Sequence, residues 1–424
     1  MTLFSPEVNE VDTSIGTKQW ESAIFSLLII LCIGVPADIF YNADRAHGPQ
    51  LPLISSLVNI LRHAAPIFCI IYFMFLGRRR SAHFGGVCGS ILVLSLIYSF
   101  STLLWAPQPF PTFVDVSELL LSVSVTIIFA KRNGAIWILN SLRSSVLVLL
   151  AGSTILAVLV PAIGIHSQGD ITNESFVGAW RGVFQHKNVF GPVAVWGLVL
   201  QLGYIFWSKK RSWTDVFLLL VCVLCVLKSQ SVTAFAGAIV GVAFLCYSQI
   251  GKSLKLIMLL CGFLVITFVI SDPEYFLSLF DRDLTFTGRL PIWNFWLNLA
   301  HANWVWGRGF QASQQPEFAQ LSRSYIFSAA GHPHNAFIEM YFNQGAAGLL
   351  VFIFLVLSII TKSLTRKKHE SAIFNTGVAV IFSSCVMGMF DVGLFRFSKG
   401  TGFLIFILVV ALCLRPRPPA DVAR

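Results

Sequence analysis

The chain has 424 residues, of which 56% are hydrophobic and only 12% are charged, and its mean hydropathy is +0.75. Soluble domains carry about 25% charged residues, so this composition excludes an ordinary soluble protein and indicates a polytopic membrane protein. The formal net charge of +10 does not point to nucleic acid, because the lysines and arginines lie in short clusters between apolar segments. The lipid bilayer is an expected partner and nucleic acid is not.

Apolar segments follow one another along the whole chain. They are Glu21–Pro36, Leu53–Leu76, Phe84–Leu104, Phe113–Ala130, Val146–Ile165, Val189–Trp207, Asp215–Leu227, Val232–Tyr247, Leu256–Ile270, Ala346–Ile360, Ala372–Met389 and Gly400–Leu414. A spanning helix needs roughly 17 to 25 residues, so the shorter segments must include flanking residues. The sequence therefore predicts an all-α fold of about twelve transmembrane helices, forming a single integral membrane domain over residues 1–424.

Basic clusters follow alternate segments of this series. Examples are Arg78-Arg79-Arg80, Lys131-Arg132, Lys209-Lys210-Arg211 and Arg366-Lys367-Lys368. The positive-inside rule places these connections in the cytoplasm. Both termini are then cytoplasmic, and the long polar stretch 271–345 faces the other side of the membrane.

The 271–345 stretch is where we expect the chemistry. It holds four arginines and three histidines, namely Arg282, Arg289, Arg308, Arg323, His301, His332 and His334. Arginines on the outward side oppose the orientation signal, and a cationic site at the membrane surface suits an anionic group carried on a lipid. For Arg282 and Arg323 we expect instead ion pairs with acidic residues of the loop.

Arg289 follows Thr287-Gly288 and precedes Pro291, a pattern typical of a helix start. Beyond it, apolar and polar residues alternate with helical spacing, which predicts an amphipathic helix along the membrane surface. The amino terminus of a helix favours anions. Arg289 is therefore a candidate phosphate ligand.

His334 and Asn335 are expected to open a short helix, Ala336–Asn343, that Gly345 closes. A histidine at this place can accept a proton from a hydroxyl group, so His334 is a candidate general base. A zinc site made of His301, His332 and His334 is the alternative, but the spacing matches no metal motif and the loop has no cysteine. Asp281 and Asp283 are expected to form ion pairs and not a metal site, so neither metal nor cofactor is predicted.

A second outward cluster is Arg181-Gly-Val-Phe-Gln-His-Lys-Asn188, which holds Arg181, His186, Lys187 and Asn188. A lysine so close to the hydrocarbon is costly unless it extends to the interface or binds an anion. Both interpretations of Lys187 stay open, and Arg181 nearby favours substrate binding.

Several stretches together resemble the bacterial O-antigen ligase and exopolysaccharide polymerase superfamily. They are Trp105-Ala-Pro, Arg181–Asn188, Thr287-Gly-Arg289 with Trp293, Gly307-Arg-Gly-Phe310, and His334-Asn335 leading to Gly345 and Gly348. Ser229–Thr233 also matches in part, although Val232 stands where many relatives have a basic residue. The resemblance covers most of the chain.

The resemblance implies a membrane glycosyltransferase that works without metal and inverts the anomeric carbon. The donor would be an undecaprenyl-diphosphate-linked glycan, and the acceptor another glycan or a lipid A core. Arg181 and Arg289 would bind the diphosphate and His334 would lie beside the acceptor hydroxyl. His186, Lys187, Asn188, Arg308 and Asn335 are further candidates for substrate contact, and chain-length regulators or export proteins are candidate partners. The implied site is the periplasmic face of the inner membrane.

Two other functions fit a protein of this kind. One is a polysaccharide or lipid transporter, although a transporter is expected to carry polar residues and broken helices near the midplane. The other is a transferase that uses a polyprenyl-phosphate sugar, with Asp38 or Asp44 as the base. Among the implied reactions, we favour polymerisation of an exopolysaccharide over ligation to lipid A core.

Overall fold

A computed structural model describes residues 8–35, 39, 52–75, 82–168, 176–208, 212–251, 275, 289–325, 331–364, 368–391, 396 and 400–416. The first helices are α1 (Val8–Ile33), α3 (Pro52–Phe75), α4 (Gly86–Ser101), η1 (Thr102–Leu104), α5 (Pro109–Asn133), α6 (Ala135–Leu159) and α7 (Pro161–Gly164). They are followed by α8 (Lys187–Trp207), α9 (Trp213–Lys228), α10 (Val232–Gln249), α13 (Arg289–His301), η3 (Ala312–Gln314), α14 (Pro316–Tyr325), α15 (Ala336–Leu364), α16 (Lys368–Gly388) and α17 (Gly400–Cys413). Two short strands, β1 (Ala82–Phe84) and β2 (Leu414–Pro416), pair antiparallel.

Every predicted spanning segment except 256–270, which lies outside the described residues, coincides with a helix. Six of the described helices are long and apolar enough to cross a membrane, and four further apolar helical stretches are shorter. The protein is therefore an all-α, multi-pass membrane protein with one small two-stranded ribbon. The number of twelve spanning helices stays a prediction.

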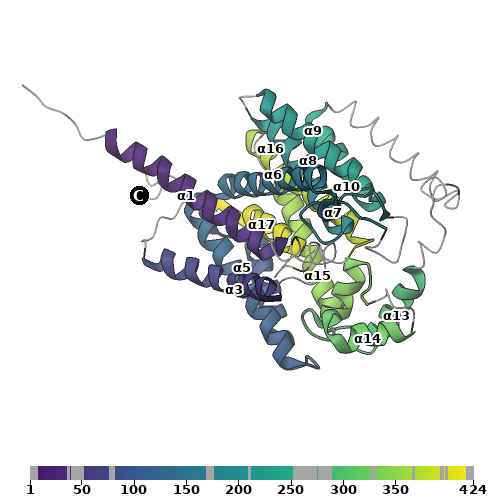
Figure 1. Cartoon of the computed structure of the whole chain (residues 1–424). Helices are drawn as coiled ribbons and strands as arrows, with labels where there is room; N and C mark the ends of the chain where they lie inside the picture. Colours follow the sequence, from purple (N-terminus) through teal and green to yellow (C-terminus); the bar gives the residue numbers. More distant parts are fainter. Residues whose placement is uncertain are drawn as a thin grey trace, which may run out of the picture.

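Helix α17 forms the centre of the bundle (Figure 1, yellow). Every residue from Thr401 to Cys413 is buried, and nearly all of them are apolar. A helix that is hydrophobic on all sides must be surrounded by other elements. Here α1, α5 and α6 pack around it, so the last predicted spanning segment is a core helix of the bundle.

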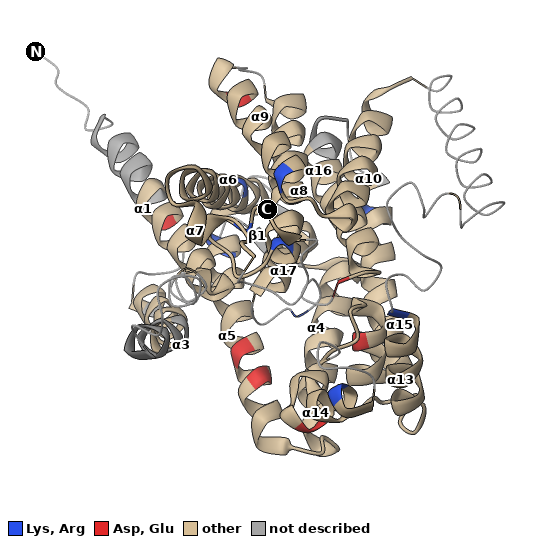
Figure 2. Cartoon of the chain, turned by 45° about the vertical axis from the view of Figure 1, so that its right-hand side comes forward, with Lys and Arg blue, Asp and Glu red and all other residues tan. Residues whose placement is uncertain are grey.

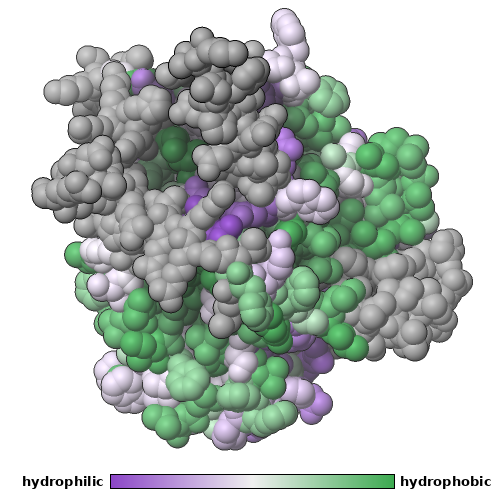
Figure 3. Space-filling model, turned by 90° about the vertical axis from the view of Figure 1, so that its left-hand side faces the viewer, coloured by the Kyte–Doolittle hydropathy of each residue, from purple (hydrophilic) through white to green (hydrophobic). Residues whose placement is uncertain are grey.

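The peripheral helices present apolar side chains outward. Phe68 is 68% exposed, Ile97 61% and Phe217 65%, so apolar surfaces of this kind are suited to lipid. Hydrophobic residues cover much of the coloured surface in Figure 3, and charged residues are sparse on the helices in Figure 2.

Helices α13 and α14 form a small layer at one end of α15 (Figure 1). They share an apolar cluster with the first part of α15, composed of Ile292, Trp296, Ala300, Ala312, Phe318 and Phe342. The ring of Trp296 meets that of Phe342 edge-on at 4.8 Å. Helix α13 is amphipathic as predicted, but its apolar side is covered by protein. The buried residues of that side therefore do not face lipid, and the position of the helix along the membrane surface stays a prediction.

Helix α15 is interrupted at Gly345, where φ is 65° and ψ is −171°. The predicted short helix does begin at Ala336 and stops being helical at Gly345, but the chain then continues as a helix to Leu364. The short helix and the following spanning segment are thus two parts of one kinked helix. A loop of residues 303–309 fits into the kink.

Candidate functional site

A tight turn at residues 331–335 places two histidines side by side at the start of α15. His334 has a left-handed backbone conformation, with φ of 51°. The Oδ1 atom of Asn335 accepts two amide hydrogens of the first helical turn, at 2.9 and 3.1 Å, so Asn335 caps the helix. The imidazole rings of His332 and His334 lie 4.0 Å apart between their centroids. The prediction that this stretch opens a helix is confirmed.

The imidazole of His332 lies in surroundings that keep it neutral. Its Nδ1 atom is buried and has no hydrogen-bond partner among the described residues. Burial is the largest cause that lowers the pKa of His332 well below 6.5, followed by His334 and by the charges of Arg396, Arg323 and Arg289. A neutral imidazole offers a lone pair, so this ring can accept a hydrogen bond or a proton.

Two of these arginines come from the outer helices. Arg289 is the first residue of α13, and its Nη1 atom donates to the carbonyl of Phe390 at 2.5 Å, just beyond α16. Arg323 lies in the last turn of α14, where its guanidinium is so close to Gly331 that a Cβ atom there would stand 2.8 Å from Nη2. The two arginines near the histidine turn therefore come from two different helices.

The third arginine, Arg396, lies between α16 and α17 and is paired with Glu339 in the first turn of α15. Its Nη2 atom is 2.6 Å from Oε1, and Nε is 3.0 and 3.3 Å from the two carboxylate oxygens. Arg396 was not among the residues predicted from the sequence. It could have been found, because it opposes the positive-inside pattern in the same way as Arg289.

The ion pair predicted for Arg282 is not tested, and the one predicted for Arg323 is not seen among the described residues. Arg282, Asp281 and Asp283 lie outside the described residues. Among the residues that the structure describes, no carboxylate lies within ion-pair distance of Arg323. Arg323 therefore contributes its charge to the surroundings of His332.

Arg308 contacts residues of three helices, α13, α14 and α15. Its Nε and Nη2 atoms donate to the carbonyl of Leu299, at 3.4 and 3.2 Å, and its guanidinium lies near the rings of Phe318 and Phe342. These contacts satisfy a carbonyl at the end of α13. The predicted contact of Arg308 with substrate stays a prediction.

The second predicted cluster surrounds the start of α8. Arg181 is 0% exposed, and its guanidinium donates to the carbonyls of Ile163 at 2.7 Å and Ala162 at 3.1 Å. It thereby caps the short helix α7. The diphosphate role of Arg181 stays a prediction, but the side chain has a structural role as well.

Lys187 is 6% exposed and turns into the protein. Its Nζ atom donates to the carbonyl of Gln230 at 3.2 Å and lies 4.3 Å from the ring centroid of Phe176. The snorkelling interpretation is therefore wrong for this side chain. His186 caps α8, because its Nδ1 atom accepts the amide hydrogen of Asn188 at 3.1 Å.

Helices α10 and α16 connect the two clusters. The loop before α10 contacts the second cluster through Gln230, and Met387, near the end of α16, packs on Gly237 of α10. Phe390, beyond the same end of α16, accepts the hydrogen bond of Arg289. Both clusters therefore lie toward the same end of these helices.

Metal-binding side chains do not gather in the described part of the chain. There, no group of three His, Cys, Asp or Glu residues is placed to hold an ion. His301, the third member of the zinc alternative, is exposed at the end of α13.

Comparison with known proteins shows similarity to one family over part of the chain. The O-antigen ligase family model matches residues 216–353. The exopolysaccharide production protein ExoQ of Rhizobium meliloti (strain 1021) is 27% identical over 223 residues, which are 46% of this chain and 48% of that protein. The chain is therefore similar to O-antigen ligases and exopolysaccharide polymerases over part of its length. The match spans about half the length of this curated relative.

The region matched by the O-antigen ligase model runs from α9 into the second part of α15. It contains Arg289, Arg323 and the two histidines of the turn. Arg181 and Arg396 lie outside it, on either side in the sequence. The fold thus adds Arg396 to the part of the site that the family model covers.

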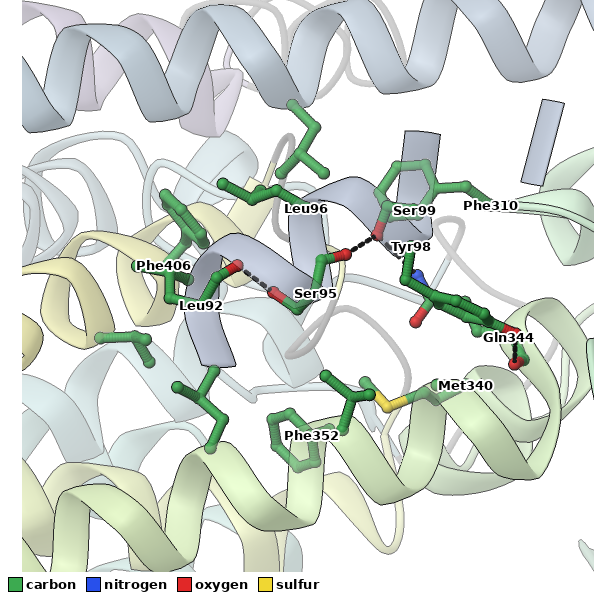
Figure 4. Close-up of a pocket in the computed structure, with 15 residues that line it drawn as sticks. Leu92, Ser95, Leu96, Tyr98, Ser99, Phe310, Met340, Gln344, Phe352 and Phe406 are labelled. Carbon is green, nitrogen blue, oxygen red and sulfur yellow. Dashed lines mark hydrogen bonds between the residues drawn. The ribbon is translucent and has the colours of Figure 1, made fainter. Parts of the chain in front are cut away.

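A cavity of about 40 Å³ lies between α4 and α15, and residues of α5 and α17 also line it (Figure 4). Its polar side chains bond to one another or to the backbone: Tyr98 donates to the carbonyl of Gln344 at 2.7 Å, and Gln344 donates to Ser99 at 3.1 Å. Most of the remaining lining is apolar. The cavity has room for only a few water-sized groups, which is too little for a glycan.

Proposed function

We propose that this chain is a membrane glycosyltransferase that takes a glycan from undecaprenyl diphosphate and joins it to a hydroxyl group of a second glycan. The observation that carries the proposal is the His332–His334 pair with three arginines around it. A proton acceptor next to several cations suits a reaction in which a hydroxyl loses a proton while an anionic group departs. The family supports the same class of reaction.

In this proposal His334 accepts the proton of the acceptor hydroxyl. The hydroxyl oxygen forms a bond to the anomeric carbon while the bond from that carbon to the diphosphate oxygen breaks, so the carbon is inverted. The electron pair leaves with the diphosphate, whose added charge Arg289 stabilises. Arginine can supply this stabilisation without a metal ion, since its planar fork binds two oxygens at once. Arg181 is proposed to hold the lipid-linked end of the same diphosphate.

We place the reaction at the periplasmic face of a bacterial inner membrane, in the 271–345 region of a single membrane domain. This orientation follows from the basic clusters and puts both termini in the cytoplasm. Reporter fusions test it: those after Ser208 and Leu364 are expected to report cytoplasm, and one after Glu317 is expected to report periplasm. A cytoplasmic signal at Glu317 would reject the orientation and the donor with it.

Polymerisation of an exopolysaccharide or an O-antigen repeat unit is the specific role we propose. The curated relative is named for exopolysaccharide production, whereas the name of the matching family model favours a second candidate, an O-antigen ligase that uses lipid A core as acceptor. Deletion of the gene in its host separates the two. Loss of long secreted polysaccharide with normal lipopolysaccharide is the expected result. Intact polymer that fails to become attached to lipid A core would show that the chain is a ligase.

A further inference from the structure

The ion pair of Glu339 and Arg396 lies next to the proposed reaction centre. The side chain of Glu339 is 5% exposed and that of Arg396 is 22% exposed, so the pair is largely shielded from solvent. The two nitrogens of Arg396 contact both carboxylate oxygens, at 2.6 to 3.3 Å. This is the fork geometry that orders a guanidinium most strongly.

Glu339 also binds the outer layer, through Ser313 of η3. The hydroxyl of Ser313, in η3, donates to Oε1 of Glu339 at 2.8 Å. The amide of Ser313 donates to Asn343 at 2.8 Å, one turn further along α15. Glu339 therefore joins three separate segments, namely the outer loop, the start of α15 and the chain between α16 and α17.

We propose that Arg396 is a positioning residue of the glycosyl transfer reaction: Glu339, in the first turn of α15, holds it so that a fixed positive charge stands beside the turn that carries His332 and His334. This inference rests on the proposed function, but it assigns Arg396 a part that needs no contact with substrate. The charge would act on the imidazole of His332 in a largely shielded site, where electrostatic interactions are stronger than in water.

The groups that lower the pKa of His332 come from several parts of the chain. His334 is in the same turn, Arg289 comes from α13, Arg323 from α14 and Arg396 from the segment before α17. Of the three cations, Arg396 makes the largest contribution to lowering the pKa of His332. Glu339 partly offsets the charge of Arg396. Removal of Arg396 therefore makes the potential at His332 less positive, and removal of the Glu339 charge makes it more positive.

The first test measures the protonation of the two imidazoles directly and needs no glycan donor. Diethyl pyrocarbonate acylates neutral imidazole, and mass spectrometry of the peptide that holds His332 and His334 follows the reaction from pH 5 to pH 8. The midpoint belongs to the coupled pair. In Arg396→Gln we expect the midpoint to rise by about half to one pH unit. Arg396→Lys keeps the charge and should stay near wild type, while Glu339→Gln should leave the midpoint unchanged or lower it.

Arg132→Gln is the matched control. Arg132 forms a comparable pair with Glu21, at 2.7 Å between α5 and α1, away from the histidine turn. It should leave the midpoint unchanged. An equal upward shift in Arg396→Gln, Glu339→Gln and Arg132→Gln would mean that loosened structure causes the effect, and would overturn the proposal.

The second test measures transfer by purified protein from an undecaprenyl-diphosphate-linked glycan at several pH values. Arg396→Gln should move the acid limb of the rate profile upward by the same amount, with the donor KM within about twofold of wild type. A tenfold rise in KM with an unmoved acid limb would make Arg396 a substrate ligand and reject the positioning role. If wild type shows no transfer while the acylation midpoint still shifts, the proposed function fails and the electrostatic role of Arg396 stands.

Discussion

The amide of Ala346 donates to the carbonyl of Trp304 at 2.7 Å, which ties the outer loop into the kink of α15. Ala347 makes the same kind of bond to Val305 at 3.0 Å. On the other side of the kink, the carbonyls of Phe342 and Asn343 accept the amides of Arg308 and Gly309, at 3.0 and 2.8 Å. Backbone groups freed by the break in the helix are thus satisfied by the loop, as buried polar groups require.

Replacement of Gly345 by alanine should destabilise this junction. Its φ of 65° is unfavourable for residues with a side chain, and a Cβ atom would lie 2.2 Å from the carbonyl oxygen of Val305. We expect a loss of about 2 kcal/mol or more, seen as a fall of several degrees in the apparent melting temperature in detergent. Gly251→Ala is the control, since nothing lies within 4 Å of its Cβ position. Equal melting temperatures for the two variants would contradict this account.

The general-base role of His334 is best tested with asparagine. Asparagine tolerates the left-handed conformation that His334 adopts, so His334→Asn removes the imidazole with little backbone strain. We expect transfer to fall by about 10²- to 10⁴-fold with an unchanged melting temperature. His301→Asn is the same substitution at an exposed site in the outer layer and should keep activity. Activity of His334→Asn within about tenfold of wild type would rule out the base.

Hydropathy and charge were enough to predict the apolar helices of this protein, because lipid forces every spanning segment to be apolar and helical. They also located the histidine turn and the start of α13. They did not predict α14, which lies in a stretch rich in Gln and Ser. They could not show which ends of the helices meet. The pairing of Arg396 with Glu339 joins residues that are far apart in sequence, and only the folded structure brings the two side chains together.

The directions in which side chains point could not be predicted from the sequence either. Lys187 and Arg181 were read as outward cations, yet both are buried and bonded to backbone carbonyls. The apolar pattern of α13 fits a helix on the membrane surface as well as a helix packed against protein. Phe342 of α15 decides between them, since it covers Trp296.

Arg181→Ala should cost stability as well as activity. The guanidinium is fully buried and satisfies two carbonyls of α7, so its removal leaves both unpaired and opens a void. We expect a loss of about 2–4 kcal/mol in unfolding free energy. Arg323→Ala, at an exposed arginine, should leave the melting temperature unchanged. A stable but inactive Arg181→Ala protein would instead favour a purely substrate-binding role.

Arg289→Gln should weaken use of the lipid diphosphate donor. A charge-assisted hydrogen bond contributes about 1.5–3 kcal/mol, which corresponds to roughly a 10- to 100-fold loss in kcat/KM. Arg289→Lys should rescue only part of it, because lysine lacks the planar fork. Phe390→Leu removes the ring near Arg289 but keeps the carbonyl that the arginine contacts, and it should leave kcat/KM within about threefold. Normal kcat/KM in Arg289→Gln would show that the diphosphate binds elsewhere.

The stability of the protein should fall as the pH drops below about 6.5, in part because of His332. Burial and the neighbouring cations lower the pKa of His332 in the folded state, whereas an unfolded chain keeps the ordinary value of 6.5. Above 6.5 the group is neutral in both states and has no effect. Below it, the unfolded chain takes up a proton that the folded protein does not, so unfolding is favoured by up to about 1.4 kcal/mol per pH unit until the folded pKa is reached. His332→Gln cannot take up that proton, so its melting temperature should fall less than that of wild type between pH 6.5 and pH 5. Parallel melting curves for the two proteins over this range would mean that His332 titrates normally in the folded state.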